Sequence, residues 1–177
     1  MIREAPRIET ERLVLRPWRR EDFEPHWAIQ QQPDVYRHFG PDPIGAEDCW
    51  RRMCAATGLW ALVGYGWWAV ETRTEGRLIG TVGLLYPRRD MKPQYFDGPE
   101  MGWAMSSDVH GQGMAREAST AVLDWAKANL APTAIWAMIA PANTPSIRLA
   151  ERLGFAFHGE AVHLGTTVNI YRRPAAS

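Results

Sequence analysis

Hydrophobic and polar positions in the first half of the chain predict a strand, two helices and a β-hairpin. Apolar and basic residues alternate over 12–18, which is typical of a strand, and a helix is expected over 20–31, closed by Pro33. Apolar residues at three- to five-residue spacings predict a second helix over 45–59. The hairpin strands, which a polar connection containing glycine joins, are expected over 67–71 and 78–86.

The second half alternates strands and helices. The segment 87–98 is rich in prolines and charges and is expected to be a loop, a candidate for a flap that faces substrate. A strand over 100–105 leads through the glycine-bearing turn 106–113 into a helix over 114–130. A second strand-to-helix unit follows, with an apolar strand over 134–140. Its helix is expected to have Thr144 as the N-cap, Pro145 as the first helical residue and Gly154 as the left-handed terminator, and two last strands follow over 155–164 and 167–173.

Composition narrows the class of protein. The 177 residues are 46% hydrophobic and 23% charged, which indicates a single domain over 1–177. Lys plus Arg and Asp plus Glu both number 20, so no net field favours nucleic acid or an acidic membrane as a partner. The most apolar stretch, 61–70, is too short to span a bilayer, and 1–12 lacks the apolar core of a signal peptide. We therefore expect a cytoplasmic protein with no nucleic acid or membrane partner.

Metal and disulfide chemistry are not expected. Cys49 and Cys54 fall on different faces of one predicted helix. No His lies at a ligand spacing from another His or Cys, and no acidic cluster joins the five, which are His26, His38, His110, His158 and His163. These residues are expected to be ordinary thiols and imidazoles.

The turn 110–116 is the strongest candidate for chemistry. Small residues at Gly111, Gly113 and Ala115 would let a ligand approach the main chain. The unpaired amides and positive dipole end of the following helix suit a phosphate. The spacing fits neither the dinucleotide fingerprint nor a P-loop. Taken alone, the glycines are equally consistent with a simple chain reversal.

Two motifs carry a resemblance to a known family. His110-x-x-Gly113-x-Ala115 resembles the Q/R-x-x-G-x-G/A acyl-CoA motif of the GNAT N-acetyltransferases, and 143–155 is similar to their N-x-x-S-x-x-x-x-E-K-x-G-F motif. With the run RIETERLVLRPW at 7–18, the resemblance covers nearly the whole chain and looks like the RimJ/RimL-type branch. It implies an α/β (α+β) fold whose mixed, mostly antiparallel sheet of six to seven strands is flanked by about four helices.

The resemblance also implies how acetyl-CoA, the expected co-substrate, would bind. The pyrophosphate would lie on main-chain amides, the pantetheine would pair with a strand edge, and Asn143 would point its amide at the pantetheine. His110 stands where the family usually has Gln or Arg, which leaves the amides as the principal contact. The expected cofactor-binding residues are Trp103, Ala104, Met105, His110, Gly111, Gln112, Gly113, Met114, Ala115, Arg116, Asn143 and Ser146.

The catalytic assignments follow from what amine acetylation requires. The amine must lose a proton, and Glu100 is the candidate to take it through water, because alternation places it on one face with Gly102 and Ala104. Glu100 is alternatively a solvated residue at the strand end, and Asp97, Asp108 and His163 are the other candidates for the base. Ser146 is the candidate hydrogen-bond donor to the departing thiolate, or equally an ordinary helix-start residue. A strand N–H within 103–105 would meet the carbonyl oxygen.

The acceptor is left open between a peptide amino terminus and a small-molecule amine. Trp60, Trp67 and Trp68 suggest an aromatic-walled cleft, although core packing explains most tryptophans equally well. A non-catalytic CoA-binding sensor and a nucleotide-binding module are the alternatives to an enzyme. The family often forms dimers, so a homodimer is a possible assembly.

Overall fold

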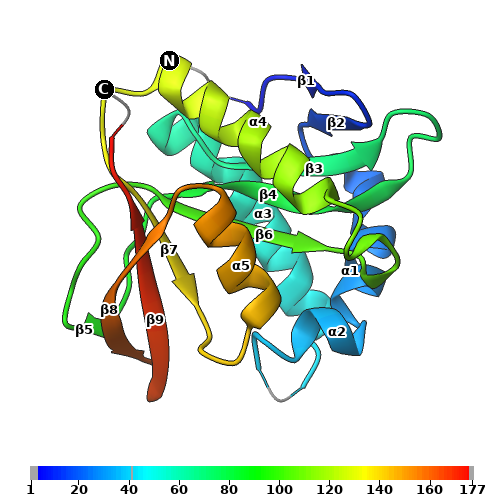
Figure 1. The fold of residues 1–177 in the computed structure, drawn as a ribbon. Helices are drawn as coiled ribbons and strands as arrows, with labels where there is room; N and C mark the ends of the chain where they lie inside the picture. Colours follow the sequence, from blue (N-terminus) through cyan, green and yellow to red (C-terminus); the bar gives the residue numbers. More distant parts are fainter. Residues whose placement is uncertain (1–3, 41, 176–177) are drawn as a thin grey trace.

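A nine-stranded mixed sheet runs through the computed structural model, which describes residues 4–40 and 42–175 (Figure 1). The order across the sheet is β1-β2-β3-β4-β6-β7-β9-β8-β5, and every neighbouring pair is antiparallel except β6 and β7. The strands are β1 (Ile8–Glu9), β2 (Leu13–Arg16), β3 (Trp67–Thr72), β4 (Leu78–Leu85), β5 (Met91–Lys92), β6 (Glu100–Met105), β7 (Ile135–Ile139), β8 (Ala156–His163) and β9 (Thr166–Arg173).

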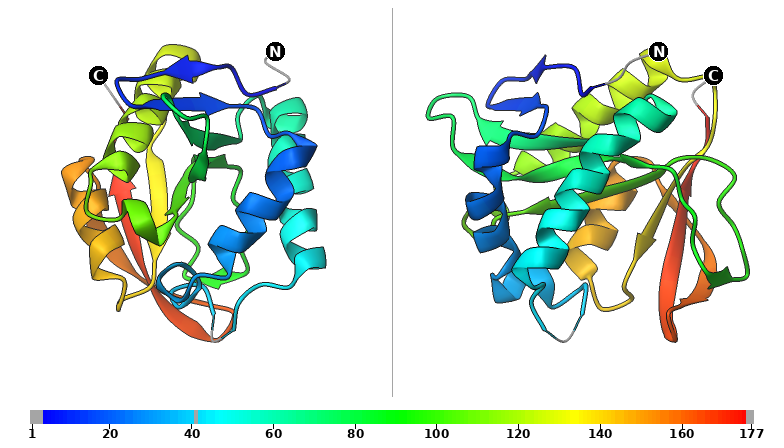
Figure 2. Two further views of the ribbon diagram at one scale, coloured as in Figure 1. Left: turned by 90° about the vertical axis from the view of Figure 1, so that its right-hand side faces the viewer. Right: turned by 180° about the vertical axis from the view of Figure 1, so that it is seen from behind.

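Helices cover both faces of this sheet. The α-helices are α1 (Phe23–Gln30), α2 (Pro33–Tyr36), α3 (Ala46–Val63), α4 (Met114–Asn129) and α5 (Thr144–Arg152), and short 3₁₀ turns lie at Arg20–Asp22 and Ser107–Val109. Figure 2 shows α4 and α5 on one side of the sheet and α1 and α3 on the other. In the described residues, no helix is long and apolar enough to cross a membrane.

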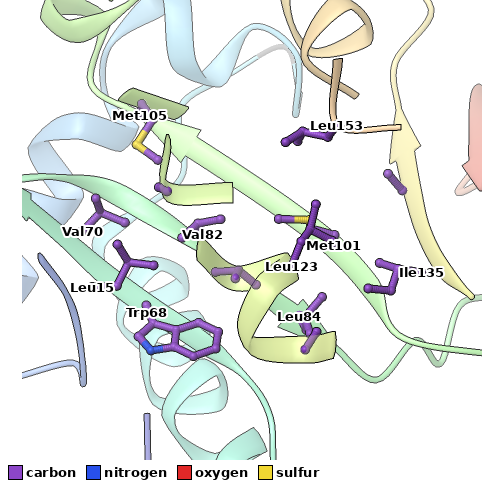
Figure 3. Packing of buried hydrophobic residues seen from close by; sticks show 14 of the residues in the cluster. Leu15, Trp68, Val70, Val82, Leu84, Met101, Met105, Leu123, Ile135 and Leu153 are labelled. Carbon is purple, nitrogen blue, oxygen red and sulfur yellow. The ribbon is translucent and has the colours of Figure 1, made fainter. Parts of the chain in front are cut away.

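The main core lies between the sheet and α4. Alternate strand residues such as Leu15, Val70, Val82 and Met101 form one buried cluster that includes Leu123 of α4 (Figure 3). On the opposite face a smaller cluster packs α1 and α2 on the sheet through Ile29, Val35, Ala69 and Leu78, with Ala104 against it. Consecutive residues of β3 and β6 therefore belong to opposite faces, as the alternation predicts.

Several expected boundaries are wrong, each for a local reason. Pro33 begins α2 rather than only closing the previous helix, because the first helical turn needs no proline N–H. The helix expected to end at residue 59 continues to Val63, where Gly64 adopts a left-handed conformation (φ 79°). The expected loop 87–98 contains β5, which pairs Met91 with His163. With the two-residue strands β1 and β5, the described sheet exceeds the expected six to seven strands, and five helices replace the expected four.

The strand-to-helix connection after β2 is held by a buried ion cluster. The Arg16 guanidinium donates to both Asp22 oxygens at 2.7 Å and to Glu71 Oε2 at 2.5 Å. The Asp22 hydrogen bonds raise the pKa of Arg16 above its ordinary value, although burial opposes them. Removing one partner of such a cluster would leave a buried charge unpaired, so the cluster fixes α1 on the sheet.

His26 of α1 is buried in the neutral form. Its ring meets the edge of Trp18 (centroids 4.8 Å apart), and within the described residues neither His26 Nδ1 nor Trp18 Nε1 has a hydrogen-bond partner. Burial lowers the pKa of His26 to about 4, and the Asp22 carboxylate opposes this shift.

This shift predicts a loss of stability in mild acid. Because the folded-state pKa lies below the unfolded value of about 6.5, the unfolded chain binds the extra proton as the pH falls through this window. Between pH 7 and pH 5 the free energy of unfolding should fall by about 2 kcal/mol from this group alone. Urea unfolding of the wild type and of a His26→Phe variant at both pH values measures it. Equal pH dependence in the two proteins would contradict the assignment.

Candidate active site

An opening lies between β6 and β7. These parallel strands share one register pair, Glu100 with Trp136, and Trp136 N–H donates to Pro99 O at 2.8 Å. Beyond that point the strands diverge (Figure 1), whereas β6 is paired with β4 along all six of its residues. The edge of β6 that faces β7 therefore lacks a strand partner from Gly102 to Met105 among the described residues.

The alternation of main-chain groups decides which amides face this opening. Since Pro99 directs its carbonyl toward β7, Met101, Trp103 and Met105 direct their main-chain groups the same way, and Ala104 directs its groups toward β4. His110 Nε2 lies 2.9 Å from Met105 O and so already occupies that carbonyl. Of the strand residues expected to bind the cofactor, which are Trp103, Ala104 and Met105, Trp103 is the one whose main-chain N–H and C=O both face the opening without a partner in the described part of the chain.

The turn after β6 ends in a helix start with free amides. Gly111 and Gly113 are left-handed (φ 75° and 79°), and Gly113 is the N-cap of α4. The first helical bond runs from Glu117 N–H to Gly113 O (3.0 Å), so the amides of Gly113 and of the three residues after it precede that bond. Gln112 N–H instead donates to Val109 O at 3.4 Å, within the turn. Nothing lies within 4 Å of the place where a Gly111 side chain would begin, so the turn is open there.

A cation that the sequence did not indicate stands beside this turn. Arg12, from the β1–β2 connection, donates from Nη1 to Gln112 O (3.0 Å) and from Nε to Glu117 Oε2 (2.7 Å). Thr10 Oγ1 donates to the other oxygen of Glu117 at 2.6 Å. Burial raises the pKa of Glu117, but the hydrogen bonds from Thr10 and Arg12 outweigh it and leave that pKa below its ordinary value. Glu117 offsets much of the Arg12 charge, but Arg12 Nη2 lies 3.6 Å from the Gly113 Cβ position, so one face of the guanidinium stands at the amino end of α4.

Across the opening, α5 presents Asn143 and Ser146. Asn143, not Thr144 as expected, is the N-cap, because its Oδ1 accepts from Ser146 N–H at 3.2 Å. Ser146 Oγ accepts from Trp103 Nε1 at 3.2 Å, which links α5 to β6. Gly154 is left-handed (φ 84°) after the helix, as predicted.

The carboxylate of Glu100 lies at the narrow end of the opening. It is 4% exposed, and both of its oxygens accept hydrogen bonds from Arg89, at 2.7 and 2.8 Å. Gly102 and Ala104 share its face of β6, as predicted. A carboxylate has about four lone-pair positions, so two remain for a water molecule or an amine.

The alternative bases lie elsewhere. Asp97 accepts from Trp136 Nε1 (2.8 Å), Asp108 pairs with Arg77 (2.9 Å), and His163 Nδ1 lies 3.2 Å from Asp90 O. Among the residues described, no group of three or more His, Cys, Asp or Glu side chains could hold a metal ion, and Cys49 and Cys54 are both free. The structure joins Trp103 and Ser146 by a hydrogen bond beside the opening. It places Glu100 at the paired end of β6, with its side chain on the other face of the sheet.

Sequence reasoning missed Arg12 and Arg89, and it named Trp67 as a candidate cleft wall without separating it from Trp60 and Trp68. Arg12 was expected only as the first residue of a strand, and Arg89 lies in a polar connection whose composition fits any solvated loop. Trp67 was grouped with Trp60 and Trp68, but those two are 1% and 0% exposed whereas Trp67 is partly exposed. Two strand glycines, Gly83 and Gly102, are the signal that could have singled it out.

Comparison with known proteins gives the family. The profile of the Acetyltransferase (GNAT) domain matches residues 12–156. The uncharacterized N-acetyltransferase p20 of Bacillus licheniformis is 28% identical over 153 residues, which are 86% of this chain and 83% of that protein. A Bordetella pertussis structure assigned to the GnaT-family acetyltransferases is 31% identical, covers 96% of this chain and 99% of its own, and has a TM-score of 0.83. An acetyltransferase from Agrobacterium tumefaciens is 27% identical over 95% of this chain and 94% of its own, with a TM-score of 0.80. The chain therefore belongs to the GNAT family and is an N-acetyltransferase.

Proposed function

We propose that the protein transfers the acetyl group of acetyl-CoA to a primary amine by direct attack in a ternary complex. The amine would be a peptide or protein amino terminus or a small molecule. One observation carries this proposal: the unpaired edge of β6 leads to the free amides of α4, beside the Arg12 guanidinium. A strand edge suits a long amide-containing arm, and a helix start with a nearby cation suits its phosphates.

The residues present fit acetyl-CoA. The amides of Gly113 to Arg116 would bind the pyrophosphate, with Arg12 as the neighbouring cation. The Met101 carbonyl and the main-chain groups of Trp103 would pair with the pantetheine amides. Asn143 keeps its Nδ2 for the same arm, because only its Oδ1 is used for capping.

The chemistry would fall to three groups of this chain. Glu100 would accept the amine proton through a water molecule, while Arg89 holds its carboxylate in place. The Trp103 main-chain N–H would donate to the carbonyl oxygen as that oxygen gains charge. Ser146 would donate its hydroxyl hydrogen to the departing thiolate, because Trp103 Nε1 already occupies one of its lone pairs.

The RimJ/RimL-like branch is the proposed subfamily, with the run at 7–18 as its support. A ribosomal-protein-S5-alanine acetyltransferase from Vibrio fischeri shares the fold at 21% identity, with a TM-score of 0.73. Likeness at that level concerns the fold, so the acceptor needs a direct test.

An acceptor screen tests the proposed function. Amino-terminal peptides and small primary amines are incubated with acetyl-CoA, and the release of free thiol is measured. We expect amine-dependent release, and thermal protection by acetyl-CoA but not by ATP or NAD. Binding of acetyl-CoA without transfer to any amine would identify a sensor instead, and protection by ATP or NAD would favour a nucleotide-binding module.

The pair Trp103 and Ser146 gives a sharper prediction. Ser146→Ala should slow transfer from acetyl-CoA but have less effect with an acyl donor whose leaving thiol is more acidic. Trp103→Phe keeps an aromatic ring but removes the indole N–H, and it should cost about threefold to tenfold in kcat with the same dependence on the donor. In the Ser146→Ala background, Trp103→Phe should cost little more. Additive losses, equal for both donors, would assign both residues to packing.

A further inference from the structure

Trp67 lies across two neighbouring strands on the face of the sheet covered by α1 and α3. Trp67, Gly83 and Gly102 stand side by side in the registers of β3, β4 and β6. A side chain begun at Gly102 would come within 2.5 Å of Trp67 Cη2. One begun at Gly83 would meet main-chain atoms first, Gly66 O and Trp67 Cα at 2.5 Å, and Trp67 Cγ at 3.0 Å. The indole therefore lies on Gly102, where any larger residue would displace it, and Gly83 lets the main chain that carries the indole approach β4.

Core packing does not account for this arrangement. Trp60 and Trp68 are buried in the main core, whereas Trp67 is partly exposed and belongs to none of the hydrophobic clusters of the described residues. Glycine inside a strand weakens it, and usually marks a place where another group must approach closely. Here Gly102 makes room for the ring and Gly83 for the main chain that carries it, and the ring presents a flat apolar surface without completing a core.

This surface adjoins the narrow end of the β6–β7 opening. Glu100 stands two residues from Gly102 on the same face of β6, and Leu85 is its partner across β4. Both Glu100 oxygens are held by Arg89, and Asp97 is used by Trp136. The Glu100 carboxylate is thus already paired with a cation, so it offers a polycationic acceptor less negative charge than a free carboxylate would.

We propose that the Trp67 indole is the floor of the acceptor subsite and that it selects a primary amine carried on an aromatic ring. The proposal rests on the proposed function, which brings the amine to the opening beside Glu100. With the amine there, the body of the acceptor lies over the indole. Aromatic rings stack offset on such a surface, which a thin alkyl chain covers less completely.

The test compares two primary amines, 2-phenylethylamine and butylamine, as acceptors for the wild type and Trp67→Leu. The wild type should prefer 2-phenylethylamine. Trp67→Leu should lower the kcat/KM for 2-phenylethylamine by about tenfold and the kcat/KM for butylamine by less than about threefold. The Kd for acetyl-CoA, measured by calorimetry, should stay unchanged.

A matched glycine pair provides the second variant and its control. Gly102→Ala keeps the indole but displaces it from the sheet. It should therefore reproduce the selective loss of kcat/KM for 2-phenylethylamine. Gly58→Ala adds the same methyl group within α3, where nothing lies within 4 Å, and should leave both amines unaffected.

Equal losses for both amines, or no loss, in Trp67→Leu would overturn the subsite while leaving acetyl transfer intact. Failure of the wild type to bind acetyl-CoA, or to acetylate any amine, would instead overturn the proposed function and the subsite with it.

Discussion

A Gly113→Val variant is expected to bind acetyl-CoA on the order of 100-fold more weakly than the wild type. Gly113 is left-handed (φ 79°), a conformation that a β-branched residue adopts only with strain. Its side chain would begin 3.6 Å from Arg12 Nη2, between the guanidinium and the amides proposed to hold the pyrophosphate. Calorimetry with acetyl-CoA measures the loss, and circular dichroism checks that the variant is folded.

Gly76→Val is the matched control for this experiment. Gly76 lies between β3 and β4, is also left-handed (φ 64°), and has nothing within 4 Å of its Cβ position. The variant should carry comparable backbone strain and keep the wild-type affinity. Unchanged affinity in folded Gly113→Val, or the same loss in both variants, would remove the anion site from this turn.

A Glu100→Gln variant is expected to keep the acetyl-CoA affinity and lose on the order of 100-fold or more in kcat. The amide keeps the shape of the side chain but cannot take a proton from the amine. The rising limb of the pH–rate profile should flatten as well. Steady-state kinetics against pH, beside acetyl-CoA calorimetry, measures both effects.

Arg89→Gln tests whether Glu100 accepts the amine proton or only forms a structural ion pair with Arg89. Arg89 lies in the connection between β4 and β5, and its ion pair with the buried Glu100 ties that connection to β6. If Glu100 takes the proton, Arg89→Gln should lower kcat less than Glu100→Gln and keep the sloping pH profile. Equal losses with equal profiles, or a changed acetyl-CoA affinity in Glu100→Gln, would make the pair a structural tie only.

Local patterns predicted most of the fold because each strong element carries its own period. The hairpin of β3 and β4, the shared face of Glu100 and Gly102, and the strand–turn–helix around Gly113 all follow from alternation and from glycine at positive φ. The strands β1 and β5 have two residues each, which is too short for any period to appear. They exist because a neighbouring strand supplies hydrogen bonds.

The parts of the candidate site that escaped prediction depend on contacts distant in sequence. Arg12 meets Glu117 across 105 residues, just as Arg16, outside the site, meets Glu71 across 55. A charged residue in a polar connection has no local signature of its eventual partner. The N-cap of α5 did have a local signal. Asn143 is as good an N-cap residue as Thr144 and stands directly before it, so the cap could have been predicted correctly from the sequence.

The single register pair between β6 and β7 divides the sheet into two hydrogen-bonded blocks. One block holds β1 to β4 with β6, the other holds β7, β9, β8 and β5, and each is continuous within itself. Widening the boundary between them breaks far fewer main-chain bonds than separating β4 from β6 or β7 from β9. Within the interior of the sheet, local opening should therefore occur where acetyl-CoA is proposed to bind. A bound pantetheine would act as the missing strand, joining the two blocks into one cooperative unit.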